Sequence, residues 1–486
     1  MNDAAVLSLA ILLPLVGAVL CALRRGTAWL ALCGAAALTG CAGLLALRVA
    51  DGGLVVVQAG GWPAPFGVTL LADGLSVALL LAAGVVGTAV CAARLSEDHP
   101  PVGDALVLVL LGGSAGVLLS GDLFNLYVWL EVTLVASWGL VALGGRRLQL
   151  EAALRYGVAN VLASALLLAG IALLFGQTGT LNLAHLSAAL AAAESPPLVR
   201  ACLVFLVVAL GVKTALIPVA RWLTASYAAP TPTVAALIAA LLTKLGAYAL
   251  LRVMACAQEA GAEPVRELLL WAGSATALGG ALLSVAERDL RRLVAALVIS
   301  HMGMIAVGVG LLTRASVSAA VFMAAQEALT LAAMFLAVEG LQRRLGSADL
   351  SRLGDMAART PGLAALLALP ALSLAGVAPL PGFWAELVLV RACVQADRPW
   401  LVVALLVSAL LALYTLLRAL SRTLLAPAPP LEAPGHTAGR ALPLGQLVLA
   451  AALLLLPVAL GPTLAALDAA SRVALTPARL RQAVLR

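Results

Sequence analysis

The chain has 486 residues, of which 63% are hydrophobic and only 11% are charged, with a formal net charge of +7. Soluble domains have roughly 45–50% apolar and about 25% charged residues, and a soluble fold of this length lacks the interior to bury the excess. The composition therefore excludes a soluble enzyme, a disordered chain and a nucleic-acid-binding protein. The apolar runs do not alternate with polar residues as barrel strands do, so we predict an all-α integral membrane protein.

Apolar runs long enough to cross a bilayer recur along the whole chain and predict about fourteen transmembrane helices. We expect them near residues 4–23, 27–49, 69–93, 104–120, 122–143, 151–175, 198–220, 231–255, 265–286, 291–312, 315–340, 361–395, 398–424 and 441–468. Three helices within residues 1–103 would precede a core at 104–424, and a loop, the last helix and a tail would occupy 425–486.

Prolines interrupt two of these runs. The run 361–395 is too long for one straight crossing and contains Pro379 and Pro381, so we expect a broken helix there. Pro218 lacks the N–H that would continue the helix, so the earlier run should open one residue after Lys213. Two broken helices at separated positions are typical of inverted repeats around a site near the middle of the membrane.

The spacing of the two breaks predicts two inverted repeats of five helices, at about 104–255 and 265–424. If the N-terminus lies outside, the inside loops carry most of the loop arginines, which supports this orientation. An even number of helices would then place both termini on the outer face. Four arginines of the C-terminal tail argue the other way; they are Arg472, Arg479, Arg481 and Arg486.

Lysine is rare in this chain, and its placement is informative. Of the 30 Lys and Arg residues only Lys213 and Lys244 are lysines, and both lie inside apolar runs. Arginine stays charged in practice, whereas a buried lysine can lose its proton. Ionisable groups inside a membrane are functional by default, so the two lysines indicate sites that need a proton able to leave.

Three further polar groups within the expected spans complete the candidate site. Glu131 lies near the middle of its span, where a carboxylate costs about 2.5–3.5 kcal/mol and needs a partner. Lys213 is the natural partner, with Lys244 on the following helix. Glu386 lies just past the second break, and His301 lies near mid-span, where a neutral imidazole can relay protons.

Other polar residues carry weaker signals. Glu327 could belong to the same polar chain, and Asp73 could face the interior or cap a helix. Glu339 and Asp104, at the edges of spans, are expected to be hydrated. No Cys pair or His spacing indicates a metal or iron–sulfur site, and no phosphate-binding or haem motif is present, so we expect no metal and no cofactor. The loop histidines are His99, His185 and His436.

Four stretches resemble the antiporter-like subunits shared by respiratory complex I, membrane-bound hydrogenases and Mrp-type cation/proton antiporters. They are GDLFNLYVWLE (121–131), GVKTALIP (211–218), LTKLG (242–246) and ERDLRRL (287–293). The resemblance covers nearly the whole chain. The segments GWPAPFG (61–67) and GTLN (179–182), with the chain length, are most similar to the D subunit of Mrp antiporters.

The resemblance implies fourteen helices with inverted repeats, a place in the bacterial inner membrane and work inside a hetero-oligomer. It matches Glu131 to the mid-helix Glu of the family, Lys213 to the Lys of the first broken helix and Lys244 to the Lys of the next helix. His301 stands where Mrp relatives often have Gln. At this position the chain is closer to the complex I and hydrogenase relatives.

The second repeat departs from the family pattern. Relatives usually have Lys at the place of Glu386, although some complex I relatives have Glu. The preceding helix often reads His-x-x-x-Lys, where this chain has Gln326 and Thr330. The second half of the path could therefore conduct differently or be weakened.

The expected function is proton translocation within a multisubunit monovalent cation (Na⁺)/H⁺ antiporter. In this hypothesis protons move between Lys213, Lys244, His301 and Glu386, and Glu131 tunes the proton affinity of Lys213. One alternative is a pump subunit of a complex I-like oxidoreductase or a hydrogenase, with the same residues and a redox energy source. A second alternative is a structural subunit with a degenerate path. The sequence does not indicate which cation is exchanged.

Overall fold

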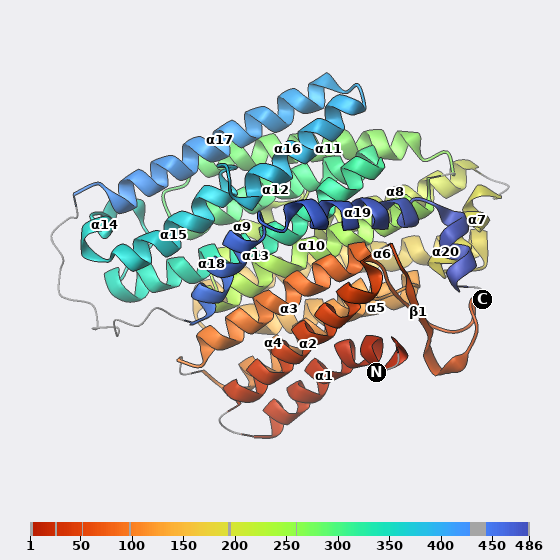
Figure 1. Cartoon of the computed structure of the whole chain (residues 1–486), viewed down its shortest axis with the longest axis horizontal. Helices are drawn as coiled ribbons and strands as arrows, with labels where there is room; N and C mark the ends of the chain where they lie inside the picture. The colour runs from red at the N-terminus through yellow and green to blue at the C-terminus, as the bar shows by residue number, and fades with distance from the viewer. Residues whose placement is uncertain are drawn as a thin grey trace.

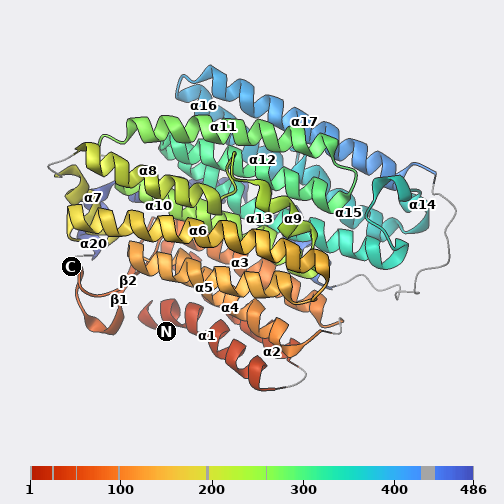
Figure 2. The same ribbon diagram turned by 180° about the vertical axis from the view of Figure 1, so that it is seen from behind.

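The computed structural model describes residues 3–24, 27–50, 52–96, 99–192, 196–258, 260–427 and 444–484. Long helices run side by side from one end of the molecule to the other, and the two marked chain ends lie near the same end of this bundle (Figures 1 and 2). The helical membrane fold predicted from composition is confirmed.

Within the described residues, eleven helices are long and apolar enough to cross a membrane, or twelve if α18 and α19 form one bent crossing. The eleven are α1 (Asp3–Leu23), α2 (Ala28–Val49), α3 (Gly74–Arg94), α4 (Pro101–Leu118), α5 (Leu123–Ala142), α6 (Arg147–Thr178), α10 (Pro232–Cys256), α11 (Glu263–Ala286), α12 (Leu290–Leu311), α13 (Arg314–Leu345) and α17 (Pro399–Leu424). The count of fourteen stays a prediction. It is reached only if the bent pair α18–α19 and each of the two broken helices are counted as one crossing.

The remaining helical segments are shorter. They are η1 (Ala59–Gly61), α7 (Leu183–Ala191), α8 (Pro196–Lys213), α9 (Arg221–Ala228), η2 (Leu350–Arg352), α14 (Met356–Arg359), α15 (Pro361–Leu374), α16 (Pro381–Gln395), α18 (Leu444–Leu455), α19 (Leu460–Ala474) and α20 (Pro477–Val484). The pairs α8–α9 and α15–α16 are the two broken helices expected from the prolines.

A short β-hairpin near the N-terminus departs from the all-α expectation. Strand β1 (Val55–Gln58) pairs antiparallel with β2 (Thr69–Ala72), where the sequence predicted the start of a helix. The β-branched run before Gln58 favours a strand. The following helix begins only at Gly74, because the Asp73 carboxylate accepts a hydrogen bond from the Ser76 N–H in a capping box.

The two breaks have the same backbone geometry. Ala215 (φ 58°) follows α8, and Gly376 (φ 67°) follows α15. In both cases the N–H of this residue donates to the carbonyl three positions earlier, and the next N–H donates to the carbonyl five positions earlier. Each helix thus ends by turning its last carbonyls onto its own chain, which is how a helix can stop inside a membrane.

Other landmarks follow the same repeat. Asp122 caps α5 and forms an antiparallel bridge with Asn182, whereas Asp289 caps α12 and forms the same bridge with Asp349. The helices that follow α5 and α12 are α6 and α13, each of 32 residues. The bridge partners Asn182 and Asp349 precede α7 and η2–α14, and α7 and α14 lie at opposite ends of the bundle (Figure 1). These relations are those of two inverted repeats.

The last predicted helix, 441–468, is wrong as a single straight crossing. Residues 441–443 lie outside the described residues, and α18 and α19 meet at an angle of 81°. Pro457 lies in this bend, where it removes a backbone donor and clashes with the carbonyl four residues earlier.

Helices α10, α12 and α13 form the centre of the molecule. In their most apolar windows 94%, 100% and 94% of the residues are buried, against 39% for α1, α2, α6 and α17. Because the outer helices and the bilayer surround these three, an ionisable side chain on them has no route to bulk water except through other polar groups. Lys244, His301 and Glu327 are on these helices.

Candidate functional site

The first polar group joins α5, α6 and α8. Lys213 Nζ lies 3.3 Å from Glu131 Oε1 and donates a hydrogen bond of 2.9 Å to Ser164 Oγ. The Ser164 hydroxyl in turn donates to the same Glu131 oxygen. The lysine side chain is 7% exposed and the glutamate side chain 28% exposed. The contact expected between Glu131 and Lys213 is therefore present, with a hydroxyl bridging the two charges.

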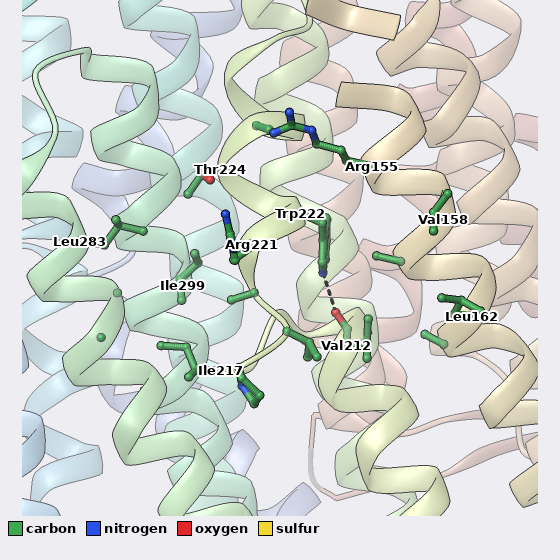
Figure 3. A pocket seen from close by; sticks show the side chains of 18 of the residues that line it. Arg155, Val158, Leu162, Val212, Ile217, Arg221, Trp222, Thr224, Leu283 and Ile299 are labelled. Carbon is green, nitrogen blue, oxygen red and sulfur yellow. Dashed lines mark hydrogen bonds between the residues drawn. The ribbon is translucent and has the colours of Figure 1, made fainter. Parts of the chain in front are cut away.

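The break in the helix explains why the Lys213 amine is held here. Lys213 is the last residue of α8, so its positive charge sits at the negative end of the helix dipole. The indole Nε1 of Trp222 donates 3.1 Å to the carbonyl of Val212, which also accepts a hydrogen bond from the Ala215 N–H at the break (Figure 3). The first turn after the break thus stabilises the end of the helix that carries the amine.

A small cavity lies beside this group. Its volume is about 20 Å³, which suits about one water molecule. Polar lining comes from Thr133, Tyr156, Asn160 and Lys213. A water there would have several hydrogen-bonding partners, as a buried water requires.

The second polar group joins the three central helices. Lys244 Nζ on α10 lies 3.2 Å from Glu327 Oε1 on α13, and His301 Nδ1 on α12 lies 3.6 Å from the same oxygen. The side chains are 4%, 0% and 2% exposed, respectively. Lys244 also donates 3.2 Å to the carbonyl of Ala239. One carboxylate therefore lies between an amine and an imidazole, all three shut away from solvent.

Glu327 is the residue that sequence reasoning undervalued. The sequence ranks it among the weaker candidates and offers Lys244 as a further partner for Glu131, whereas the structure pairs Lys244 with Glu327. The available signal was a carboxylate in an apolar span with Lys244 and His301 on other spans. No spacing rule connects helices that are distant in the sequence. Ser164 gave no signal, because one serine in an apolar helix is ordinary.

Glu386 lies on α16, just past the second break as expected. Its carboxylate lies against Gly376, where a Cβ would come within 2.5 Å of Glu386 Oε2. A cavity of about 140 Å³ is lined by Glu386 and by Met304, one turn along α12 from His301. The side chain is therefore packed onto the break itself and shares a cavity wall with the helix that carries the imidazole.

Gln326 and Thr330 form a polar link between α13 and the second broken helix. Thr330 Oγ1 donates to the Gln326 carbonyl at 2.8 Å and lies 3.4 Å from Ser373 Oγ on α15. All three are buried. The two departures from the family pattern thus supply an amide and a hydroxyl beside Glu327 in the chain, and the hydroxyl of Thr330 lies near Ser373, three residues before the break at Gly376.

The structure corrects one of the two predictions at the edges of spans. Asp104 is not hydrated: its side chain is 2% exposed and accepts from Arg94, from Thr27 at 2.7 Å and pairs with His99 at 2.7 Å. The loop and helix that follow Arg94 fold back so that His99 and Asp104 lie beside it. The apolar pattern of the sequence does not reveal this contact. Glu339, by contrast, keeps part of its side chain exposed and pairs with the exposed Arg343, so its expected hydration is not contradicted.

The remaining candidates are mainly structural. Asp73 both caps α3 and pairs with Arg252 at 2.7 Å. His185 lies on α7, and His436 lies outside the described residues. Among the described residues, no group of three His, Cys, Asp or Glu side chains could hold a metal ion.

Residues 120–412, which carry both polar groups and both breaks, match the family described as NADH:quinone oxidoreductase/Mrp antiporter, TM. The chain belongs to this family.

Members of the NADH:quinone oxidoreductase/Mrp antiporter family are similar to this chain over most of its length. The D subunit of the Na(+)/H(+) antiporter of Alkalihalophilus pseudofirmus is 34% identical over 379 residues, 77% of each chain. The N subunit of the NADH-quinone oxidoreductase of Desulforudis audaxviator is 33% identical over 393 residues, 79% of this chain and 78% of the relative.

Solved structures of the family have the same fold. A chain of the Mrp complex from a Dietzia species has a TM-score of 0.91 and 28% identity, with all of both chains covered. A chain of respiratory complex I from Thermus thermophilus, with bound NADH, has a TM-score of 0.86 and 26% identity, over 98% of this chain and 99% of that chain.

Proposed function

We propose that this chain is the proton-translocating subunit of a multisubunit monovalent cation (Na⁺)/H⁺ antiporter. The observation that carries the proposal is that each buried amine contacts a carboxylate, Lys213 with Glu131 beside the first break and Lys244 with Glu327 in the centre. A buried ion pair rarely improves stability over apolar packing, so its presence in a membrane favours a functional role.

The chemistry proposed for each amine is reversible loss of its proton. While Glu131 and the Ser164 hydroxyl lie close to Lys213, the ammonium form is favoured; when the carboxylate moves away, the desolvated amine releases its proton. Arginine could not do this at any accessible pH. The proton would then pass to Lys244 after that amine has given its own proton to Glu327, the carboxylate that His301 also contacts.

The second half of the path would run through hydroxyl groups to Glu386. Gln326, next to Glu327 in the chain, contacts Thr330, and Thr330 lies near Ser373. Ser373 precedes the break at Gly376, against which Glu386 packs. Hydroxyl chains can relay protons when water joins them. One proton moved through 100 mV yields about 2.3 kcal/mol, more than the about 1.36 kcal/mol of a tenfold change in proton affinity.

The setting proposed is a hetero-oligomer in a bacterial inner membrane, with both termini on the outer face. The Mrp complex and complex I, which contain chains similar to this one, are assemblies of several subunits. Hard cations bind several oxygen ligands, and the described residues contain no group of three Asp, Glu, His or Cys side chains that could hold a metal ion. In this proposal cation transport belongs to the whole complex, with other membrane subunits as partners.

A redox-driven complex is the second candidate. The similarity to a chain of an NADH-quinone oxidoreductase and to a chain of complex I favours it, because the same residues would move protons with a different energy source. A structural role with a degenerate path is the third. The absence of a lysine in the second broken helix of this chain is the feature that favours it.

The experiment is reconstitution of the intact native complex in liposomes that contain a pH-sensitive dye, without any electron donor. A sodium gradient is expected to drive proton movement, and Glu131→Gln is expected to reduce its rate. Glu151→Gln is the matched control, because Glu151 is a half-exposed carboxylate that pairs with Arg147 on the surface of α6.

Each alternative gives a different result. Proton movement that requires oxidation of NADH or hydrogen would identify the redox complex, and identification of the purified subunits would support that reading. Unchanged exchange by Glu131→Gln combined with Lys213→Ala would show a structural role.

A further inference from the structure

A large cleft opens on the side of the bundle, separate from the buried polar groups. Its volume is about 1120 Å³, and it lies between α6, the α8–α9 break and helices α11 and α12. Figure 3 shows Val158 and Leu162 of α6 on one side and Leu283 and Ile299 on the other, with the break between them. We refer to this space as the α6–α11 cleft.

Three arginines line the α6–α11 cleft. Arg155 on α6, Arg221 at the start of α9 and Arg292 in the first turn of α12 are all exposed. In the ranges that the structure describes, none of the three forms an ion pair with a carboxylate; Glu287 is the one acidic residue of the lining. The cleft lining thus carries an excess of positive charge, with three arginines against the single carboxylate of Glu287.

The charges and the apolar walls occupy different parts of the cleft. Arg155 extends from α6 past Trp222 toward α9, where Arg221 and Thr224 lie, and Ile217 marks the other part of the cleft at the break (Figure 3). Below Arg155 on α6, the next exposed side chains are apolar, with Val158 53% and Leu162 61% exposed. One part of the cleft therefore suits an anion, and the other suits hydrocarbon.

The membrane makes this arrangement specific. An arginine at the edge of the hydrocarbon region needs a counter-charge or water. A ligand with an anionic group on an apolar chain would pair with the arginines and also make apolar contacts with the cleft walls. Basic pockets between transmembrane helices bind anionic lipid headgroups, and guanidinium groups match phosphate oxygens in geometry. A soluble anion would leave the apolar walls without a partner.

We propose that the α6–α11 cleft binds an anionic phospholipid, with its phosphate among Arg155, Arg221 and Arg292. The acyl chains lie along Val158, Leu162 and Leu283 toward the first break. The lipid thus packs beside the segment 214–220 that ends α8 at Lys213, on the outer side of the helix pair that holds the amine.

The test is quantification of phospholipids retained by the purified intact complex, by mass spectrometry, for Arg155→Gln, Arg221→Gln and the double variant. Each arginine near a lipid headgroup contributes about a fivefold change in affinity, so each single variant should retain less phosphatidylglycerol. Arg147→Gln is the matched control, because Arg147 lies on the same helix, is 90% exposed and already pairs with Glu151. The wild-type complex should also be stabilised against heat by added phosphatidylglycerol more than by phosphatidylcholine.

The proposal is overturned if the double variant retains as much phosphatidylglycerol as the Arg147→Gln control. Equal thermal stabilisation by phosphatidylcholine would overturn it as well, since it would show that no anionic headgroup is recognised. Cross-linking of the cleft at Leu162→Cys to a neighbouring subunit, with no lipid retained, would assign the arginines to that subunit's carboxylates. Loss of lipid binding leaves the proton-transport proposal untouched, because none of the three arginines lies in the proton path.

Discussion

Glu327 is 0% exposed, and the Lys244 amine and the His301 imidazole both lie near the same carboxylate oxygen, so its charge depends on these neighbours. Removal of one member of such a buried pair leaves an uncompensated charge, at a cost of about 3–5 kcal/mol. Removal of both members replaces charge with apolar surface and costs far less. Stability and transport can therefore be separated at this site.

We predict that Lys244→Met lowers the thermal stability of the purified complex and that Lys244→Met with Glu327→Leu restores most of it. Both variants should lose cation/proton exchange, because the central groups of the path are missing. Melting curves and dye-based exchange assays on the same preparations check the two parts. Exchange by the stable double variant at the wild-type rate would remove the Lys244–Glu327 pair from the path.

At the scale of single residues, the sequence predicted most of the site residues but missed the contact between Lys244 and Glu327. The rarity of lysine pointed to Lys213 and Lys244, and mid-span position pointed to Glu131. The partner of Lys244 could not be derived, because it depends on how α10 and α13 pack, not on local pattern. The buried cluster at Asp104 was missed for the same reason, since a helix edge looks hydrated until the chain folds back over it.

At the scale of elements, the two breaks are what bring ionisable groups to the ends of helices inside the membrane. Prolines revealed both breaks in the sequence. The β-hairpin and the bend between α18 and α19 were not anticipated. The strand residues Thr69–Ala72 read as the start of an apolar helix, and Pro457 sits in an otherwise continuous apolar run.

Gly376 offers a test of the second break. We predict that Gly376→Ala lowers exchange, because the added Cβ would come within 2.5 Å of Glu386 Oε2 and displace the carboxylate. Gly346→Ala is the matched control: Gly346 has a similar positive φ of 71°, and a Cβ there meets nothing within 4 Å. Both variants place an alanine at a positive φ, and only Gly376→Ala brings a Cβ against Glu386. Equal exchange rates for both would mean that the position of Glu386 against the break does not matter.

At the scale of the whole molecule, the two repeats share a backbone and differ in chemistry. Leu374 stands two residues before Gly376, as Lys213 stands two residues before Ala215. Val298 stands nine residues after Asp289, as Glu131 stands nine residues after Asp122. The second repeat therefore lacks the amine–carboxylate pair of the first, and its one ionisable group at the break, Glu386, comes from the other half of the broken helix.

The orientation of the bundle can be measured directly. We predict that Gln177→Cys, near α7, reacts with a membrane-impermeant thiol reagent in intact cells. Ser351→Cys, at the opposite end of the bundle, should react only in inside-out vesicles. A Cys33→Ser background is needed, because Cys33 is the exposed cysteine among the described residues. The reverse labelling pattern would place the termini on the inner face.

The central claim is that Lys213 works by releasing a proton, and Lys213→Arg tests it most directly. The arginine keeps the charge beside Glu131 but does not deprotonate. We predict that the reconstituted complex with this variant assembles normally and loses exchange by about 100-fold, the scale of a lost acid–base group. Arg252→Lys, at the buried Asp73 pair, is the control that should keep its exchange. Exchange at the wild-type rate by Lys213→Arg would contradict the account, because a fixed positive charge would then be sufficient.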